Sequence, residues 1–177
     1  MSFTVVASVL VVLILGVAFV RTRIRLSRLS RMDWEDLIAR IMPVPIDEIS
    51  IIANDYLHPR KGQLVFDTED IWAKIGRAEG LRRIYANAEI LIALAGYAQR
   101  WNPEESLMVV EMMRRDALVL RHSTLRLSFG LTVDSERLEG PFNVQQVASA
   151  YYLMRSRVLA LYETIHVGRF PQLASLL

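Results

Sequence analysis

The sequence predicts an all-α protein, with an N-terminal single transmembrane helix followed by an antiparallel helical bundle of three long helices plus shorter ones. The first observation behind this prediction is an uncharged apolar run at the N-terminus, Phe3–Val20. The second is that apolar residues recur every three or four positions in three long segments, which places them on one face of a helix. Alternation typical of a strand is weak and confined to Gln63–Phe66.

The N-terminal run has the length and composition of a membrane-spanning helix. Only Thr4 and Ser8 are polar within it, and about 20 apolar residues cross the ~30 Å hydrocarbon layer of a bilayer. No Lys or Arg precedes the run and no A-x-A-like cleavage site follows it, unlike in a secretory signal. We therefore expect residues 1–20 to be a retained signal-anchor; a cleaved signal and a buried core helix are the alternatives.

Five arginines follow the run at once, in a basic juxtamembrane segment over residues 21–32. They are Arg21, Arg23, Arg25, Arg28 and Arg31. Because cytoplasmic flanks of membrane helices are rich in Lys and Arg, the N-terminus is predicted outside and the C-terminal domain in the cytosol. Each arginine contributes about 1 kcal/mol near anionic headgroups, so the lipid bilayer is the expected contact. A docking site for one specific lipid or acidic partner is the alternative.

The basic residues of the chain are almost all arginine, since Lys61 and Lys74 are the only lysines. This bias suggests a GC-rich bacterial genome, and we expect a single-pass protein of the bacterial inner membrane. Removing the five flank arginines from the 21 basic residues leaves 16 against 19 acidic residues, a net charge of −3. No nucleic-acid partner is expected, because such a partner requires a basic surface. The absence of cysteine excludes disulfides, thiolate metal sites and Cys nucleophiles.

Residues 33–170 are predicted to form one cytosolic helical domain, and residues 171–177 an apolar C-terminal tail. The domain begins with two short helices over 46–57 and 68–75. The two prolines of Met42–Pro45 separate the first of these from the membrane-proximal helix, because proline breaks a helix interior.

Three long helices follow. The first ends near Trp101, the second spans about Glu104–Ser128, and the third begins at the N-cap Asn143 and ends before Gly168. Small residues crowd the first of them, which lets a neighbouring helix approach closely. The predicted apolar seams are Leu81, Ile84, Ala88, Leu91, Ala95 and Ala98; Val110, Met113, Ala117, Leu120, Thr124 and Leu127; and Val144, Val147, Tyr151, Met154, Val158, Leu161 and Ile165.

Five acidic residues lie near expected helix starts: Asp47, Glu48, Asp67, Glu69 and Asp70. Paired carboxylates can bind Mg²⁺ or act as general acid and base. Acids at helix N-termini also cap the helix and complement its dipole, and this is the interpretation that we favour.

The histidines His58, His122 and His166 do not form a metal-binding pattern. Glu163 and His166 have the E-x-x-H spacing, but only once. A di-iron bundle needs two such motifs plus two further carboxylates from other helices. We therefore assign no metal ligand, no cofactor site and no catalytic residue.

The loop Asp55–Gly62 combines Asp55, His58, Arg60 and Lys61. It is the best place in the chain to look for chemistry, because loops carry functional residues. It has neither the spacing nor the glycines of a phosphate-binding loop, so we favour a plain turn between helices.

Several further polar residues have ordinary structural interpretations. We expect a solvated face with an i,i+4 ion pair from the charged ones, packing from the tyrosines, and no nucleophile from the serines, which lack a nucleophile-elbow context. These residues are Glu111, Arg115, His122, Arg126, Arg155 and Arg157; Tyr151 and Tyr152; and Ser123, Ser128 and Ser149.

The sequence carries no catalytic or ligand signature. A single anchor and the apolar end Leu173–Leu177 predict a membrane-anchored helical interaction or accessory module, which binds a partner protein or membrane complex at the cytoplasmic face. The alternative is a membrane-tethered enzyme or small-molecule sensor with an unrecognised site between helices; lipid binding or membrane remodelling is a third interpretation. A pocket that gathers Asp55, His58 or Arg60 would favour the enzyme, and an exposed apolar surface would favour the protein partner.

Overall fold

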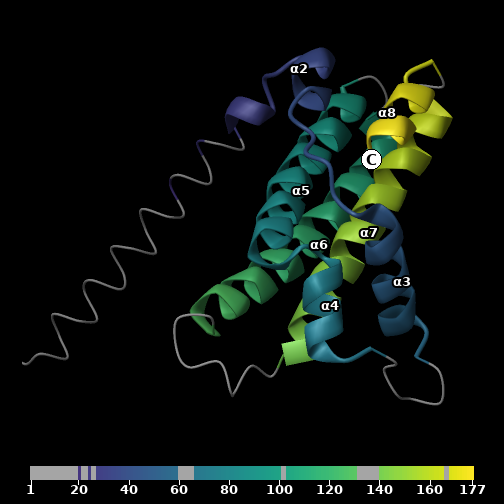
Figure 1. The fold of residues 1–177 in the computed structure, drawn as a ribbon. Coiled ribbons are helices and arrows are strands. Elements are labelled where there is room, and N and C mark those ends of the chain that lie inside the picture. Colours follow the sequence, from purple (N-terminus) through teal and green to yellow (C-terminus); the bar gives the residue numbers. More distant parts are fainter. Residues whose placement is uncertain are drawn as a thin grey trace, which may run out of the picture.

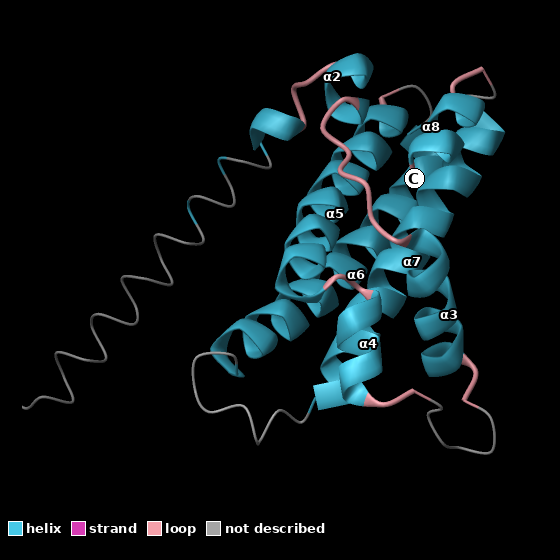
Figure 2. Cartoon of the chain, in the orientation of Figure 1, coloured by secondary structure: helices cyan, strands magenta, loops and turns pink. Residues whose placement is uncertain are grey.

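The computed structural model describes residues 20, 24, 27–59, 66–100, 103–130, 140–165 and 168–177. All regular structure in this part of the chain is helical, which confirms the all-α class and the helical bundle (Figures 1 and 2). The helices are α2 (Trp34–Ile38), α3 (Ile46–Leu57), α4 (Thr68–Lys74), α5 (Arg77–Gln99), α6 (Pro103–Gly130), α7 (Gly140–Ile165) and α8 (Phe170–Leu176).

Helix α7 lies at the centre of the bundle and contacts α3, α4, α5, α6 and α8 (Figure 1). Its predicted seam is confirmed, since six of the seven seam residues are buried and Ile165 packs against the core. A helix surrounded on several sides needs apolar or small residues beyond one seam. Ala148, Ala150 and Tyr162 supply them and are also buried.

The predicted seam of α5 is also confirmed, because all six of its residues are buried. The junction before it requires glycine at two positions. Gly76 has a φ of +82°, and a Cβ on Gly80 would lie 1.6 Å from the carbonyl oxygen of Ile75. Glycine tolerates both the positive φ and the close backbone approach. Helix α5 can therefore begin directly where α4 ends.

Among the side chains of α6 that the structure describes, the buried ones lie on one side of the helix. Val110, Met113 and Leu120 of the predicted seam are buried, and Ala117 is partly buried. The side chain of the seam residue Leu127 lies outside the described residues.

The described residues before α2, which we call the N-terminal segment, pack on the bundle. Leu29 is buried, and the guanidinium of Arg100 donates a hydrogen bond to the carbonyl of Ser30. Asn87 of α5 then holds the stretch before α3: its side chain accepts from the Met42 N–H at 2.9 Å and donates to the Met42 carbonyl at 2.7 Å. The short helix α2 between these two contacts was not predicted as a separate element.

An aromatic cluster closes one end of the bundle and joins four elements. It comprises Trp34 of α2, Tyr97 of α5, Tyr162 of α7 and Arg169, the residue before α8. The ring centroids of Trp34 and Tyr162 are 4.8 Å apart, and the Arg169 guanidinium lies 5.2 Å from the Trp34 ring and 5.4 Å from the Tyr97 ring. Such cation–π contacts are favourable when partly desolvated. The hydroxyl of Tyr162 donates to the Leu94 carbonyl at 2.9 Å.

The residues predicted to form the apolar tail belong mostly to α8. Leu173 and Leu177 are buried, whereas Leu176 is 44% exposed. Arg155 of α7 donates from Nε to the carbonyl of Leu177 at 2.9 Å. The tail therefore packs on its own domain.

The predicted anchor over residues 1–20 lies outside the described residues, apart from Val20. None of the helices in the described part of the chain combines the length and apolar character of a membrane span.

Candidate functional site

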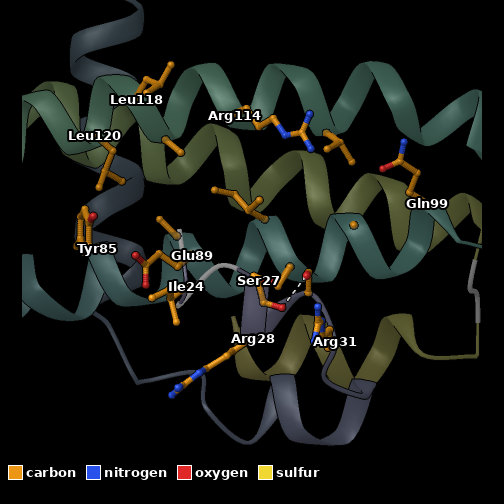
Figure 3. Close-up of a pocket in the computed structure, with 17 residues that line it drawn as sticks. Ile24, Ser27, Arg28, Arg31, Tyr85, Glu89, Gln99, Arg114, Leu118 and Leu120 are labelled. Carbon is orange, nitrogen blue, oxygen red and sulfur yellow. Dashed lines mark hydrogen bonds between the residues drawn. The ribbon is translucent and has the colours of Figure 1, made fainter. Parts of the chain in front are cut away.

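A cavity of about 1150 Å³ opens between the N-terminal segment, α5 and α6 (Figure 3). We call it the α5–α6 groove. Its apolar lining comes from Ile24, Ala88, Ile92, Ala93, Val110, Ala117, Leu118 and Leu120. Small-molecule pockets are concave, mostly apolar and typically ~300–1,000 Å³ in volume. The groove is somewhat larger than this range and could also receive part of a protein.

Small residues on α5 create the space in the groove. Ala88, Ala93 and Gly96 line it where larger side chains would reach across to α6. A Cβ added to Gly96 would have no atom within 4 Å, apart from its chain neighbours and the backbone of its own helix. Glycine in a helix interior costs about 0.5–1 kcal/mol relative to alanine. The missing side chain at Gly96 leaves room beside the backbone of α5, and a helix that packs closely against α5 needs such room.

Charged residues lie at both the rim and the wall of the groove. Arg28 and Arg31 come from the N-terminal segment and Arg114 from α6, whereas Glu89 comes from α5 (Figure 3). All three arginines are exposed, but Glu89 is only 7% exposed. The site thus combines an apolar floor, one buried acid and a basic rim.

Two of the five arginines predicted to flank the membrane border this groove. Arg28 and Arg31 line it, and Arg21, Arg23 and Arg25 lie outside the described residues.

The predicted acidic cluster is divided between two helices. Asp47 and Glu48 lie in the first turn of α3, and Glu69 and Asp70 in the first turn of α4. The Lys74 ammonium of α4 donates to Glu48 and joins the two helices. Asp67 precedes α4, and its carbonyl accepts from the Ile71 N–H at 3.1 Å. In the described part of the chain, no three His, Asp or Glu side chains come together as a metal site would require.

The described part of the loop Asp55–Gly62, which seemed best placed for chemistry, does not line the groove. Asp55 is in the last turn of α3 and the exposed His58 follows it, and neither residue lines the groove. Arg60 and Lys61 lie outside the described residues, as does His166; Glu163 is exposed on α7.

The predicted charged face of α6 is exposed at Glu111, Arg115 and His122. The ion pair on it joins Glu111 to Arg114 at 3.4 Å, at i,i+3 spacing, where i,i+4 spacing was expected. The side chains of Arg126 and Ser128 lie outside the described residues.

The remaining predicted residues hold helices together. Ser123 donates to the Gln146 side-chain oxygen at 3.0 Å, and Arg157 forms an ion pair with Asp116, so both contacts join α6 to α7. Burial lowers the pKa of Arg157. Ser149 is buried on α7, and Tyr152 packs against the core.

Tyr151 is buried, and its hydroxyl accepts a hydrogen bond from Asn87 at 3.3 Å. Desolvation raises the pKa of this tyrosine. Its role is to connect α7 to α5.

Sequence reasoning missed Asn87, Glu89 and the exposed apolar residues of α6. Asn87 and Glu89 flank the seam residue Ala88 in an otherwise apolar stretch, and polar residues so close to a seam are the signal that could have found them. Comparisons with protein-family models, with curated proteins and with solved structures found no match to this chain.

Proposed function

We propose that this protein is a membrane-anchored interaction module, and that its partner lays an amphipathic helix into the α5–α6 groove. The open space beside Gly96 is the observation that carries the proposal. Helix-in-groove recognition places the apolar face of one helix into an apolar channel of another protein. A floor of Ala88, Ala93 and Gly96 lets a partner backbone approach closely, and Ile92 and Leu118 offer larger apolar contacts.

The charges of the groove define the chemistry of this partner. Arg28, Arg31 and Arg114 at the rim favour a helix with acidic residues beside its apolar face. Such surface charges raise the association rate and set the orientation more than they raise affinity.

Anchoring at the cytoplasmic face of a bacterial inner membrane is part of the proposal. Phe3–Val20 is the spanning segment, and the arginines after it set the orientation. Because Arg28 and Arg31 belong both to this flank and to the groove, the groove opens close to the membrane surface. A partner that is itself a membrane protein gains from the high local concentration that tethering provides.

Topology reporters test the anchor. Alkaline phosphatase fused after Leu177 should be inactive and a green fluorescent fusion bright, because the C-terminus is expected in the cytosol. Replacing the five flank arginines by asparagine should weaken this bias. Strong phosphatase activity in the unaltered protein would overturn the orientation.

Filling the groove tests the partner site. Gly96→Leu should fold normally and gain about 0.5–1 kcal/mol of stability, because leucine favours a helix more than glycine does. The same side chain should block the partner. Affinity purification from detergent-solubilised membranes, with mass spectrometry of the eluate, compares this variant with Ala78→Leu, an exposed control on the same helix. If Gly96→Leu recovers the same partners as the control, the groove is not the partner site.

A further inference from the structure

The outer face of α6 carries large apolar side chains that stay accessible in the described structure. Leu107, Met108 and Leu118 are 59%, 69% and 58% exposed, and Met112 and Val119 are 37% and 45% exposed. Exposed apolar groups gathered on one surface mark an interaction site more often than scattered ones do. These residues lie on the side of α6 turned away from its buried seam.

Charged residues on this outer face are divided by sign along the helix. Along the helix, the exposed acids Glu104 and Glu111 come first, and the exposed bases Arg115 and His122 follow them. A surface with acids at one end and bases at the other complements a copy of itself that runs in the opposite direction. Self-complementarity of this kind is what a two-fold symmetric interface requires.

We propose that α6 pairs with the α6 of a second copy of this chain, antiparallel and with the two-fold axis at the level of Met113. Met113 is fully buried, so the opposite side of the helix at this level faces outward. With 3.6 residues per turn, Glu111 then lies across from Arg115 of the second copy, and Arg115 across from its Glu111. Glu104 faces His122 at each end of the pair.

The same register brings the apolar residues together. Met108 lies beside Val119 of the second copy along one edge of the contact, and Leu107 lies beside Leu118 along the other. A parallel pair would instead place Glu111 against Glu111 and Arg115 against Arg115, which like-charge repulsion disfavours. Charge order and apolar pattern therefore select the same antiparallel arrangement.

Self-association through this face shares Leu118 with the partner site proposed above, because Leu118 also lines the α5–α6 groove. Gly96 and Glu89 lie in the α5–α6 groove on α5, and the central pair Glu111 and Arg115 does not line that groove. The Gly96→Leu variant should therefore still self-associate. Failure of one proposal does not decide the other.

Cysteine substitutions test the register, because the chain has no cysteine of its own. The full-length protein is purified in detergent micelles and treated with a short thiol-specific cross-linker. A mixture of Met108→Cys and Val119→Cys chains should give a cross-linked heterodimer. Met108→Cys alone should stay monomeric on gels, since two such residues would be about 15 Å apart along the helix axis. A strong Met108→Cys homodimer would overturn the antiparallel arrangement.

Charge reversal tests the pairing itself. Glu111→Arg and Arg115→Glu should each weaken dimerisation about tenfold or more, as measured by analytical ultracentrifugation at low salt. The double variant, and an equimolar mixture of the two single variants, should restore it. Glu163→Arg, an exposed reversal on α7, is the matched control and should have no effect. A wild-type chain that sediments as a monomer at all concentrations, or single variants that the double variant does not rescue, would overturn the proposal.

Discussion

Helices α6 and α7 have nearly equal lengths, 28 and 26 residues, and pack along each other, yet their surroundings differ. Five other helices contact α7, and buried residues recur along it from Val144 to Tyr162. Helix α6 contacts mainly α5 and α7 and leaves a face with five large apolar residues exposed. Helix α7 is therefore packed on several sides, whereas α6 combines a packed side with a side available for binding.

The largest expected difference comes from the same substitution in the two helices. Val158 of α7 is fully buried and Val119 of α6 is 45% exposed. Val158→Asp buries an unpaired charge and should cost more than about 4 kcal/mol, enough to unfold the domain. Val119→Asp should change stability by no more than about 0.5 kcal/mol. Thermal unfolding of the full chain in detergent micelles, followed by circular dichroism, measures both.

The comparison between the helices would fail if the two variants had the same melting temperature. A stable Val158→Asp protein would mean that α7 is not central to the domain. A strongly destabilised Val119→Asp protein would mean that the outer face of α6 is covered, either within the monomer or by the second copy proposed above.

A smaller effect is expected from the helix that covers one part of α7. Leu173 of α8 is fully buried and Leu176 is 44% exposed. Leu173→Ala should cost about 2–5 kcal/mol, because it removes buried methyl groups and leaves a cavity. Leu176→Ala is the matched control and should stay within about 0.5 kcal/mol. Equal melting temperatures for the two variants would show that α8 adds no stability.

The smallest effect concerns an exposed ion pair on α5. Arg82 and Arg83 hydrogen-bond to Glu79 at 2.9–3.1 Å and lower its pKa from 4.5 to about 2. A carboxylate with a lowered pKa in the folded state stabilises the fold above pH 4.5, and this contribution is lost as the pH falls toward 2. Glu79→Gln should therefore melt slightly below the wild type at pH 7 and equally at pH 2. A difference that grows as the pH falls would contradict this assignment.

The seams of α5 and α7 could be predicted from sequence because burial on one side of a helix imposes a regular spacing. The outer face of α6 could not, since helical spacing alone does not tell a buried face from an uncovered one, and only the packing of the neighbouring helices shows that Leu107, Met108 and Val119 are exposed. The groove was equally inaccessible, because it depends on where residues 27–31 lie against α5. Helix α8 was missed because a seven-residue apolar segment has too few turns for a period to be visible.

The aromatic cluster has a mechanical consequence. Trp34 lies just after the N-terminal segment, and its contacts with Tyr97, Tyr162 and Arg169 connect that segment to α5, α7 and the start of α8 at once. A force applied through the N-terminal segment is therefore shared among the most deeply packed elements of the domain. Helix α6 has no residue in the cluster, so such a load reaches its outer face only through α5 and α7.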